Sequence, residues 1–203
     1  MPTGSWDVKA RIWDAATGEL LHTLQGHTWA VSSTEWSPDG TGSDQIRIAR
    51  WSPDGARLAM GTDTSIEVRD PGMGLAAQSV PHPHALTDLV WNASGEWLAG
   101  WNQCYGGAVQ LRNPSLGTHH LLVQERPVTR ADFSPDGARI ATIGSDERVR
   151  VWDVGTGKLL RALEGHMKKR PGSFGLSDVR WSPSGRWLLS RSYDTEVIVW
   201  DPD

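Results

Sequence analysis

The stretch that decides the fold is Phe133-Ser134-Pro135-Asp136-Gly137, a turn phrase that the chain repeats. Residues 36–40 and 51–55 read Trp-Ser-Pro-Asp-Gly, and weaker copies start at Trp91 and Trp181. From residue 51 onward the copies lie 40, 42 and 48 residues apart, so the period is near 42. The phrase suits a tight turn because proline presets the backbone, aspartate bonds it locally and glycine accepts unusual dihedral angles.

Short runs of β-prone residues surround this turn. Within one period they cover 128–133, 138–143, 148–152 and 158–163, with turn residues between them. A four-stranded unit cannot bury both of its faces alone, so it must stack on neighbouring units. The sequence therefore predicts an all-β fold of stacked, four-stranded antiparallel sheets.

Two further phrases repeat with the turn. Trp-Asp pairs close three units at Trp13, Trp152 and Trp200, and Gly-His pairs open two units at Gly26-His27 and Gly165-His166. Together the phrases resemble the WD-repeat family of β-propellers, in a bacterial-looking form with partly degenerate repeats. The resemblance implies one propeller domain over 1–203 with about four to five blades. The blades are expected at 3–24 (partial), 25–80 with a surplus segment at 41–50, 84–124, 126–163 and 165–201.

The strand count does not make a whole number of blades. Counting predicts 17 strands, with two in the first unit and three in the last, whereas the family typically closes its ring with seven blades. The expectation is an incomplete ring with exposed edges. Three explanations stay open: part of a larger propeller, a truncated reading frame, or a half that pairs with another chain. The surplus between Trp36 and Trp51 fits a lost blade stretch or a local duplication equally well.

A fixed spacing of 4 and 6 residues links Ser or Thr, Asp and Trp in three units. The resemblance implies that these side chains join the histidine of the Gly-His pair in a structural, hydrogen-bonded tetrad, which satisfies a buried carboxylate. The alternative is a Ser-His-Asp hydrolase, but no G-x-S-x-G phrase is present. Only one set of tetrad candidates is complete, and the other two lack the histidine. The complete set is His166, Ser190, Asp194 and Trp200, and the partial sets are Thr142, Asp146 and Trp152, and Thr3, Asp7 and Trp13.

Two units depart from the family pattern. Ala59 and Arg69 replace the hydroxyl and the tryptophan in one unit, and Arg112 replaces the tryptophan in the next. These blades are expected to be held mainly by apolar side chains, such as Leu89 and Leu111.

Two sets of exposed residues are candidates for binding a partner. The resemblance places the residue before each turn aspartate, together with Trp29, on the face that the family commonly uses for partners. A six-residue insertion contributes cations and an aromatic side chain suited to an acidic partner, although a solvated loop is the alternative. Trp6 and Trp29 could equally fill space between blades. The candidates are Trp6, Trp29, Thr62, Ser145, Tyr193, Lys168, Lys169, Arg170 and Phe174.

Composition narrows the classes of partner. The 203 residues carry 20 Lys plus Arg and 24 Asp plus Glu, a net charge of −4, which argues against nucleic acid. No apolar run is long enough to span a membrane, and the first ten residues do not resemble a signal peptide. The single cysteine, Cys104, predicts a reducing, cytoplasmic location.

Neither a metal nor a cofactor is expected. His82-Pro83-His84 and His119-His120 lack acidic or cysteine ligands at matching spacing, so they are interpreted as surface histidines. No glycine-rich phosphate loop is present.

These observations predict a non-catalytic protein–protein interaction scaffold that presents propeller loops to peptide or protein partners. Self-association, or a missing remainder of the propeller, is a further partner hypothesis. The alternative functions are a regulatory or sensor segment of a larger multidomain protein, and a propeller hydrolase or lactonase. The alternative enzymes would need catalytic groups around the central channel, and the repeats supply no such set.

Overall fold

The computed structural model describes residues 2–4, 10–13, 17–24, 48–61, 65–69, 78–82, 86–103, 107–166, 175–193 and 196–203. Over these ranges the chain forms eighteen strands in five antiparallel sheets and no helix. The predicted all-β class is therefore confirmed. No helix in the described ranges could cross a membrane.

Each sheet is a meander in which consecutive strands pair. The first sheet contains β1 (Pro2–Gly4), β2 (Ala10–Trp13) and β3 (Leu20–Leu24). The second sheet contains β4 (Ile48–Trp51), β5 (Leu58–Gly61), β6 (Ser65–Arg69) and β7 (Gln78–Pro81). The third sheet contains β8 (Asp88–Trp91), β9 (Leu98–Trp101), β10 (Ala108–Asn113) and β11 (Thr118–Val123). The last two contain β12 (Val128–Phe133), β13 (Arg139–Gly144), β14 (Val149–Asp153) and β15 (Leu159–Leu163), then β16 (Leu176–Trp181), β17 (Leu188–Ser192) and β18 (Val197–Trp200).

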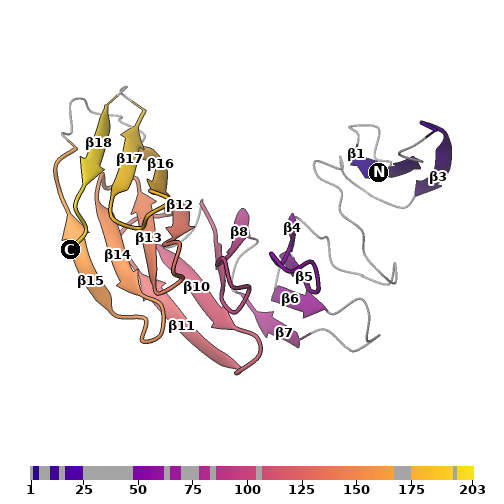
Figure 1. Ribbon diagram of the computed structural model, residues 1–203, viewed down its shortest axis with the longest axis horizontal. Coiled ribbons are helices and arrows are strands. Elements are labelled where there is room, and N and C mark those ends of the chain that lie inside the picture. Colours follow the sequence, from indigo (N-terminus) through magenta and orange to yellow (C-terminus); the bar gives the residue numbers. More distant parts are fainter. Residues whose placement is uncertain are drawn as a thin grey trace.

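The four sheets from β4 to β18 are stacked face to face in a row (Figure 1). Their first strands, β4, β8, β12 and β16, follow one another along one edge of the row. The strands of the 126–163 unit lie within one residue of their predicted positions. The first sheet contains one strand more than predicted, because Pro2–Gly4 pairs with β2. The blade boundaries stay a prediction.

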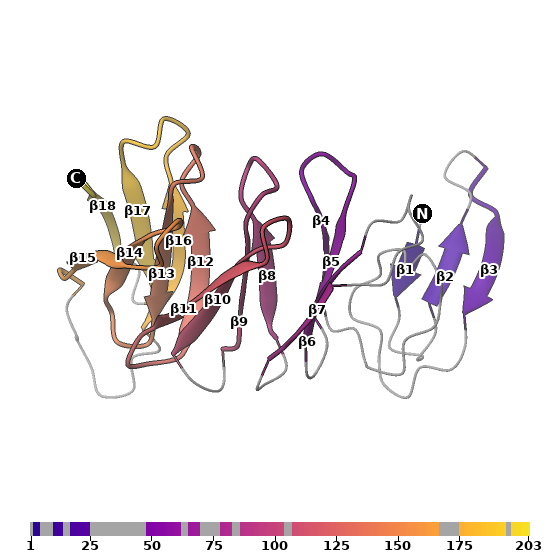
Figure 2. The same cartoon turned by 90° about the horizontal axis from the view of Figure 1, so that it is seen from below.

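The repeated phrase forms the turn between the first two strands of a sheet. At residues 134–139, the Gly137 N–H donates to the Ser134 carbonyl at 2.8 Å, and the Ala138 N–H donates to the Asp136 carboxylate at 3.0 Å. Gly137 has φ 71°, a conformation that glycine adopts without strain. Figure 2 shows the equivalent turns of four sheets on one side of the row.

The apolar core lies between neighbouring sheets. Ala141, Ile143, Val149 and Val151 of one sheet pack against Leu176, Val179, Trp181 and Leu188 of the next. A similar cluster joins the β8–β11 sheet to the β12–β15 sheet, and another joins β4–β7 to β8–β11. Stacking therefore buries both faces of an inner sheet, which a single sheet could not do.

Candidate interaction surface

The last sheet contains a buried chain of hydrogen bonds. The Trp200 Nε1–H donates to the Ser190 hydroxyl oxygen at 2.8 Å, and His166 Nε2 lies 2.7 Å from the same oxygen. Ser190 is fully buried and His166 is buried at 8% exposure. The strand register brings these groups together, because Ser190 pairs with Ile198, two residues before Trp200. The structure thus joins three of the predicted tetrad residues, and Asp194 lies outside the described residues.

The preceding sheet repeats this arrangement with a glutamine. The Trp152 Nε1–H donates to the Thr142 hydroxyl oxygen at 2.9 Å, and that hydroxyl donates to Gln124 Oε1, also at 2.9 Å. The sequence analysis missed Gln124, because its neighbour is not the glycine of a Gly-His pair. The period contained the signal, since Gln124 lies 42 residues before His166.

Asp146 bonds to a different partner from the one implied by the family resemblance. Its carboxylate accepts a hydrogen bond from Arg150 Nη2 at 2.6 Å, and both side chains are nearly buried. Within the described residues, Asp146 forms no hydrogen bond with Gln124. A neutral amide at position 124 leaves the carboxylate to a guanidinium, which can neutralise its charge.

In the first sheet, Thr3 pairs with Arg11, two residues before Trp13. Thr142 and Arg150 pair in the same register. The side chains of Thr3 and Trp13, and the whole of Asp7, lie outside what the structure describes.

Alternating charges run across the first strands. Arg50 Nη2 lies 3.2 Å from Asp88, and Arg130 reaches Asp88 at 3.8 Å and Asp178 at 3.3 Å. Arg180 also contacts Asp178, at 3.4 Å. We call these five residues the charge ladder. Its members come from four different sheets, which is why no single repeat indicated it.

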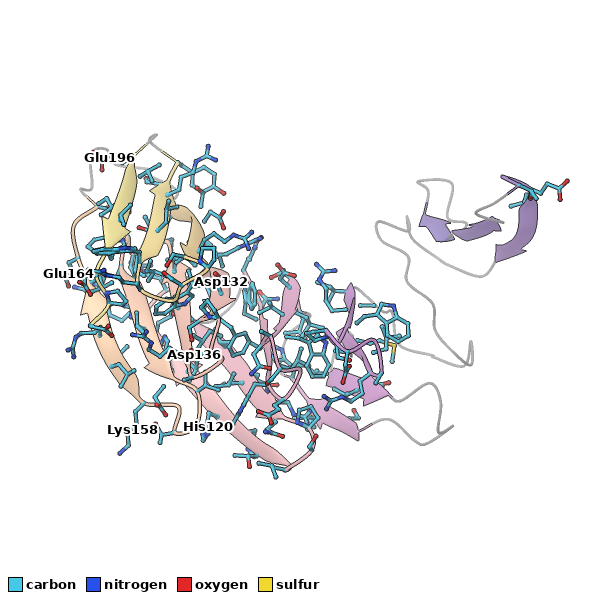
Figure 3. All side chains as sticks on the ribbon, in the orientation of Figure 1. His120, Asp132, Asp136, Lys158, Glu164 and Glu196 are labelled. Atoms are coloured by element: carbon cyan, nitrogen blue, oxygen red, sulfur yellow. The ribbon has the colours of Figure 1, made fainter. Side chains whose placement is uncertain are left out.

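Asp132 lies next to the charge ladder, where β12 meets β16 (Figure 3). Burial raises the pKa of this carboxyl, while a hydrogen bond from the Trp181 N–H opposes that rise. The N–H lies 2.8 Å from the Asp132 carboxylate. The Asp132 carboxylate therefore links two sheets through a hydrogen bond, although the burial of its negative charge is unfavourable.

A shallow groove opens beside the last sheet. It is lined by Arg130, Ser177, Asp178, Arg191 and Tyr193. Tyr193 is 63% exposed. Arg191 is exposed and has no ion-pair partner within the described ranges. The groove thus combines an unpaired cation with an exposed aromatic ring.

Gly175 links the groove to the neighbouring sheet. The Tyr193 N–H donates to the Gly175 carbonyl at 3.4 Å, and a Cβ on Gly175 would lie 2.5 Å from the Ser145 Cα. Two predicted partner-binding residues, Ser145 and Tyr193, therefore flank the same glycine. The other seven candidates, Trp6, Trp29, Thr62, Lys168, Lys169, Arg170 and Phe174, lie outside the described residues.

The family model "WD domain, G-beta repeat" matches residues 18–42, 115–153 and 157–201, more than half of the chain. The chain belongs to the WD40 repeat family. This WD40 chain is 26% identical to a ribosome biogenesis protein WDR12 homolog from Nematostella vectensis, over 98% of the chain and 51% of that protein. It is 27% identical to the COMPASS component SWD3 of Saccharomyces cerevisiae, over 74% of the chain and 49% of that protein.

A third relative is the nuclear distribution protein PAC1 of Arthroderma otae, 27% identical over 98% of the WD40 chain and 32% of that protein. The chain thus spans about half the length, or less, of these curated relatives. All three come from eukaryotes, so they give no support to the expectation of a bacterial-looking member.

The degenerate WD40 blades replace polar bonds with apolar contact. In the β8–β11 sheet, the register puts Gly100 where the next sheet has Thr142, and Ile66 and Leu89 pack against it. Arg112 stands in the tryptophan position, buried, and donates to the Ile66 carbonyl at 3.4 Å. Burial lowers the pKa of this guanidinium. The expected apolar contacts are present, since Leu89 and Leu111 are buried in two of the clusters.

The histidines of the WD40 chain form no metal site in the described ranges, where no group of three potential ligands occurs. His82 was expected at the surface but is buried, at 8% exposure. Its position, 42 residues before Gln124, explains the burial. His120 stacks on Trp97 at 5.7 Å and contacts the Gly155 carbonyl at 2.9 Å, close to the turn that holds Lys158 (Figure 3). His119 is exposed, and Cys104 and His84 lie outside the described residues.

Proposed function

We propose that this WD40 chain is a non-catalytic scaffold that binds an acidic peptide or protein segment in the groove lined by Arg130, Ser177, Asp178, Arg191 and Tyr193, where Arg130 and Arg180 already pair with Asp178. The observation that carries the proposal is the exposure of Tyr193 beside Arg191, which has no ion-pair partner in the described part of the chain. An arginine can hold a carboxylate through two parallel hydrogen bonds, and an exposed tyrosine offers apolar contact at low entropic cost. The cations of the 168–170 segment would extend the same acidic preference.

Two further findings support a scaffold over a hydrolase. The one Ser–His pair bonded in the described ranges is buried, and its serine oxygen also accepts from Trp200. A nucleophile in that position would not meet a substrate. Among the relatives, a COMPASS component bears a name that implies assembly with other proteins.

We also propose a cytoplasmic location, on the basis of the single cysteine, and a partner other than nucleic acid, on the basis of the net charge of −4. The regulatory-segment alternative has support in the relatives, because each of them is about twice as long as its match to this chain or longer.

The test is a binding assay with fluorescein-labelled acidic peptides that contain an aromatic residue. The double variant Arg191→Glu/Tyr193→Ala should weaken binding by at least about tenfold, because it reverses the charge and removes the ring. Its melting temperature should stay near that of the wild type, since both side chains are exposed. The matched control is Arg161→Glu on the outer strand β15, where the same charge change should leave binding intact.

Equal binding by the double variant and the control would disprove the proposal that acidic peptides bind in this groove. Hydrolase activity in the wild type that Ser190→Ala abolishes would disprove the scaffold itself. If Ser190 has only a structural role, the wild type shows no hydrolase activity, and Ser190→Ala lowers the melting temperature because two hydrogen bonds are lost.

A further inference from the structure

Arg191 occupies a position that is apolar in the two preceding sheets. The equivalent residues are Trp101 and Ile143, which are buried at 1% and 0% exposure, whereas Arg191 is exposed. In the strand register Arg191 lies directly opposite Asp178. Among the described sheets, only the last one places opposite charges directly across its first two strands. The register therefore offers Arg191 a neutralising carboxylate.

The two opposed charges nevertheless form no ion pair. Side chains that lie directly opposite each other on antiparallel strands share one face and are within reach of each other. The Asp178 carboxylate instead contacts two other arginines, with Oδ1 at 3.3 Å from Arg130 Nε and 3.4 Å from Arg180 Nε. The Val179 N–H donates to the same oxygen at 3.0 Å. Three donors thus hold the carboxylate that faces Arg191 in the register.

Each of these ion pairs is weak by itself, because the side chains of Arg130, Asp178 and Arg180 are 36%, 37% and 52% exposed. Two guanidinium groups and a backbone amide together compete well against the single guanidinium of Arg191. The charge ladder therefore draws away the one carboxylate that the register places beside Arg191. Arg180 contributes to this hold without lining the Arg191–Tyr193 groove.

The backbone of Arg191 is fixed independently of these charges. The Ser177 hydroxyl donates to the Arg191 carbonyl at 3.2 Å, and the strand register on either side of Ser177 is shifted by a bulge. A change of ion-pair partner at Asp178 therefore involves side chains and leaves the strand pairing in place.

We infer that Arg180 is a positioning residue that holds the Asp178 carboxylate away from Arg191 and so keeps the Arg191 guanidinium available for an acidic ligand. Without Arg180, the carboxylate keeps Arg130 as its only arginine in the ladder and shifts towards its cross-strand neighbour. It then competes with the carboxylate of a ligand. The role in binding rests on the proposed function, whereas the competition between the three arginines for Asp178 does not.

The first test measures the affinity for the fluorescein-labelled acidic peptides. Arg180→Gln should weaken binding by at least about threefold, because it releases Asp178 to neutralise Arg191. Arg180→Lys keeps a charge beside Asp178 and should stay within about twofold of the wild type. The matched control is Arg161→Gln on the exposed strand β15, which removes the same charge and should also stay within about twofold.

The decisive comparison is made in an Asp178→Asn background. Asp178→Asn alone should tighten binding by at least about threefold, because the competing carboxylate is gone. Adding Arg180→Gln to it should then change the affinity by less than about twofold, since there is no carboxylate left to release. Equal weakening by Arg180→Gln in both backgrounds would overturn the inference, because Arg180 would then attract the ligand directly. An Arg180→Gln variant that binds like the wild type would overturn it as well.

The second test needs no peptide. A double-mutant cycle of Asp178→Asn and Arg191→Gln, followed by urea denaturation, measures how strongly the two side chains interact. The coupling should change the unfolding equilibrium constant by less than about 1.5-fold in the wild type and by at least about threefold in the Arg180→Gln variant. A coupling that stays small without Arg180 would overturn the inference. A coupling that appears, in a chain that binds no acidic peptide, would support the inference and refute the proposed function.

Discussion

Gln124 accepts a hydrogen bond of 2.9 Å from the hydroxyl of Thr142, and in doing so it takes the place that His166 has in the next sheet. The hydroxyl accepts at the same time from the indole of Trp152. One buried oxygen therefore satisfies two buried side chains, one from β14 and one from the residue that follows β11.

Thr142→Val tests this junction. The substitution keeps the shape of the side chain and leaves the Trp152 Nε1–H and Gln124 Oε1 buried without a partner. We expect the free energy of unfolding, measured by urea denaturation, to be about 2 to 3 kcal/mol lower than that of the wild type. The control is Thr118→Val on the exposed part of β11, which should change stability by no more than about 0.5 kcal/mol. Equal, small losses in both variants would show that the bonds contribute nothing.

The Arg139–Trp181 contact predicts a measurable coupling between two sheets. A double-mutant cycle of Arg139→Ala and Trp181→Leu should give an interaction energy of about 1 kcal/mol, from the cation–π contact at 4.6 Å. The same cycle with the exposed Arg161→Ala in place of Arg139→Ala should be additive within about 0.5 kcal/mol. Additivity in both cycles would mean that the stacking seen here has no energetic weight.

Asp132→Asn should change the pH dependence of stability in a direction fixed by burial. Burial raises the pKa of Asp132 above 3.8, so the folded state holds its proton to higher pH than the unfolded state does. Ionisation therefore subtracts from stability as the pH rises through that interval. The amide still accepts from the Trp181 N–H and cannot ionise, so the variant should gain stability relative to the wild type between pH 3 and pH 7.

Asp136→Asn provides a control of opposite sign. A hydrogen bond from Ser134 lowers the pKa of Asp136, so its contribution is present above 3.8 and is lost as the pH falls through the lower, folded value. Urea midpoints at pH 3, 5 and 7 should show this variant losing stability relative to the wild type as the pH rises. Parallel pH curves for the two variants would contradict the assignment.

Gly175→Ala should damage both the fold and the proposed groove. Gly175 has φ 78°, and an added Cβ would lie 2.5 Å from Ser145 Cα and 2.8 Å from the Gly144 carbonyl oxygen. We expect a loss of about 2 kcal/mol from the left-handed conformation and the backbone clash, together with weaker binding of acidic peptides. Gly155→Ala, where the nearest atom lies 3.7 Å away, should be tolerated in both assays. A variant at Gly175 with wild-type stability would show that the loop can move away from Ser145.

The strands and turns could be predicted because their signals are local. Alternation over 128–133 and the Ser-Pro-Asp-Gly turn at 134–137 act within a few residues, and β12 and its turn lie where those signals place them. The bond between Thr142 and Trp152 also has a local origin, because two adjacent antiparallel strands convert a fixed sequence interval into a fixed distance.

Contacts between sheets could not be predicted in the same way. Arg130 contacts carboxylates on both β8 and β16, two strands that belong to other sheets. His82 looks like a surface residue from its neighbours, and its burial depends on its place in the repeat and on what surrounds it.

The sequence by itself determined the all-β architecture, the turns and the repeating unit, because each rests on backbone preferences and periodicity over a few residues. Only the tertiary structure decided the charge ladder, the arginine–tryptophan contacts between sheets, the hydrogen bond of Gln124 and the exposure of the last sheet. Those features depend on the stacking of sheets, which brings together side chains about 40 positions apart in the sequence. Their proximity then determines how deeply each charged group is buried and which partner it has.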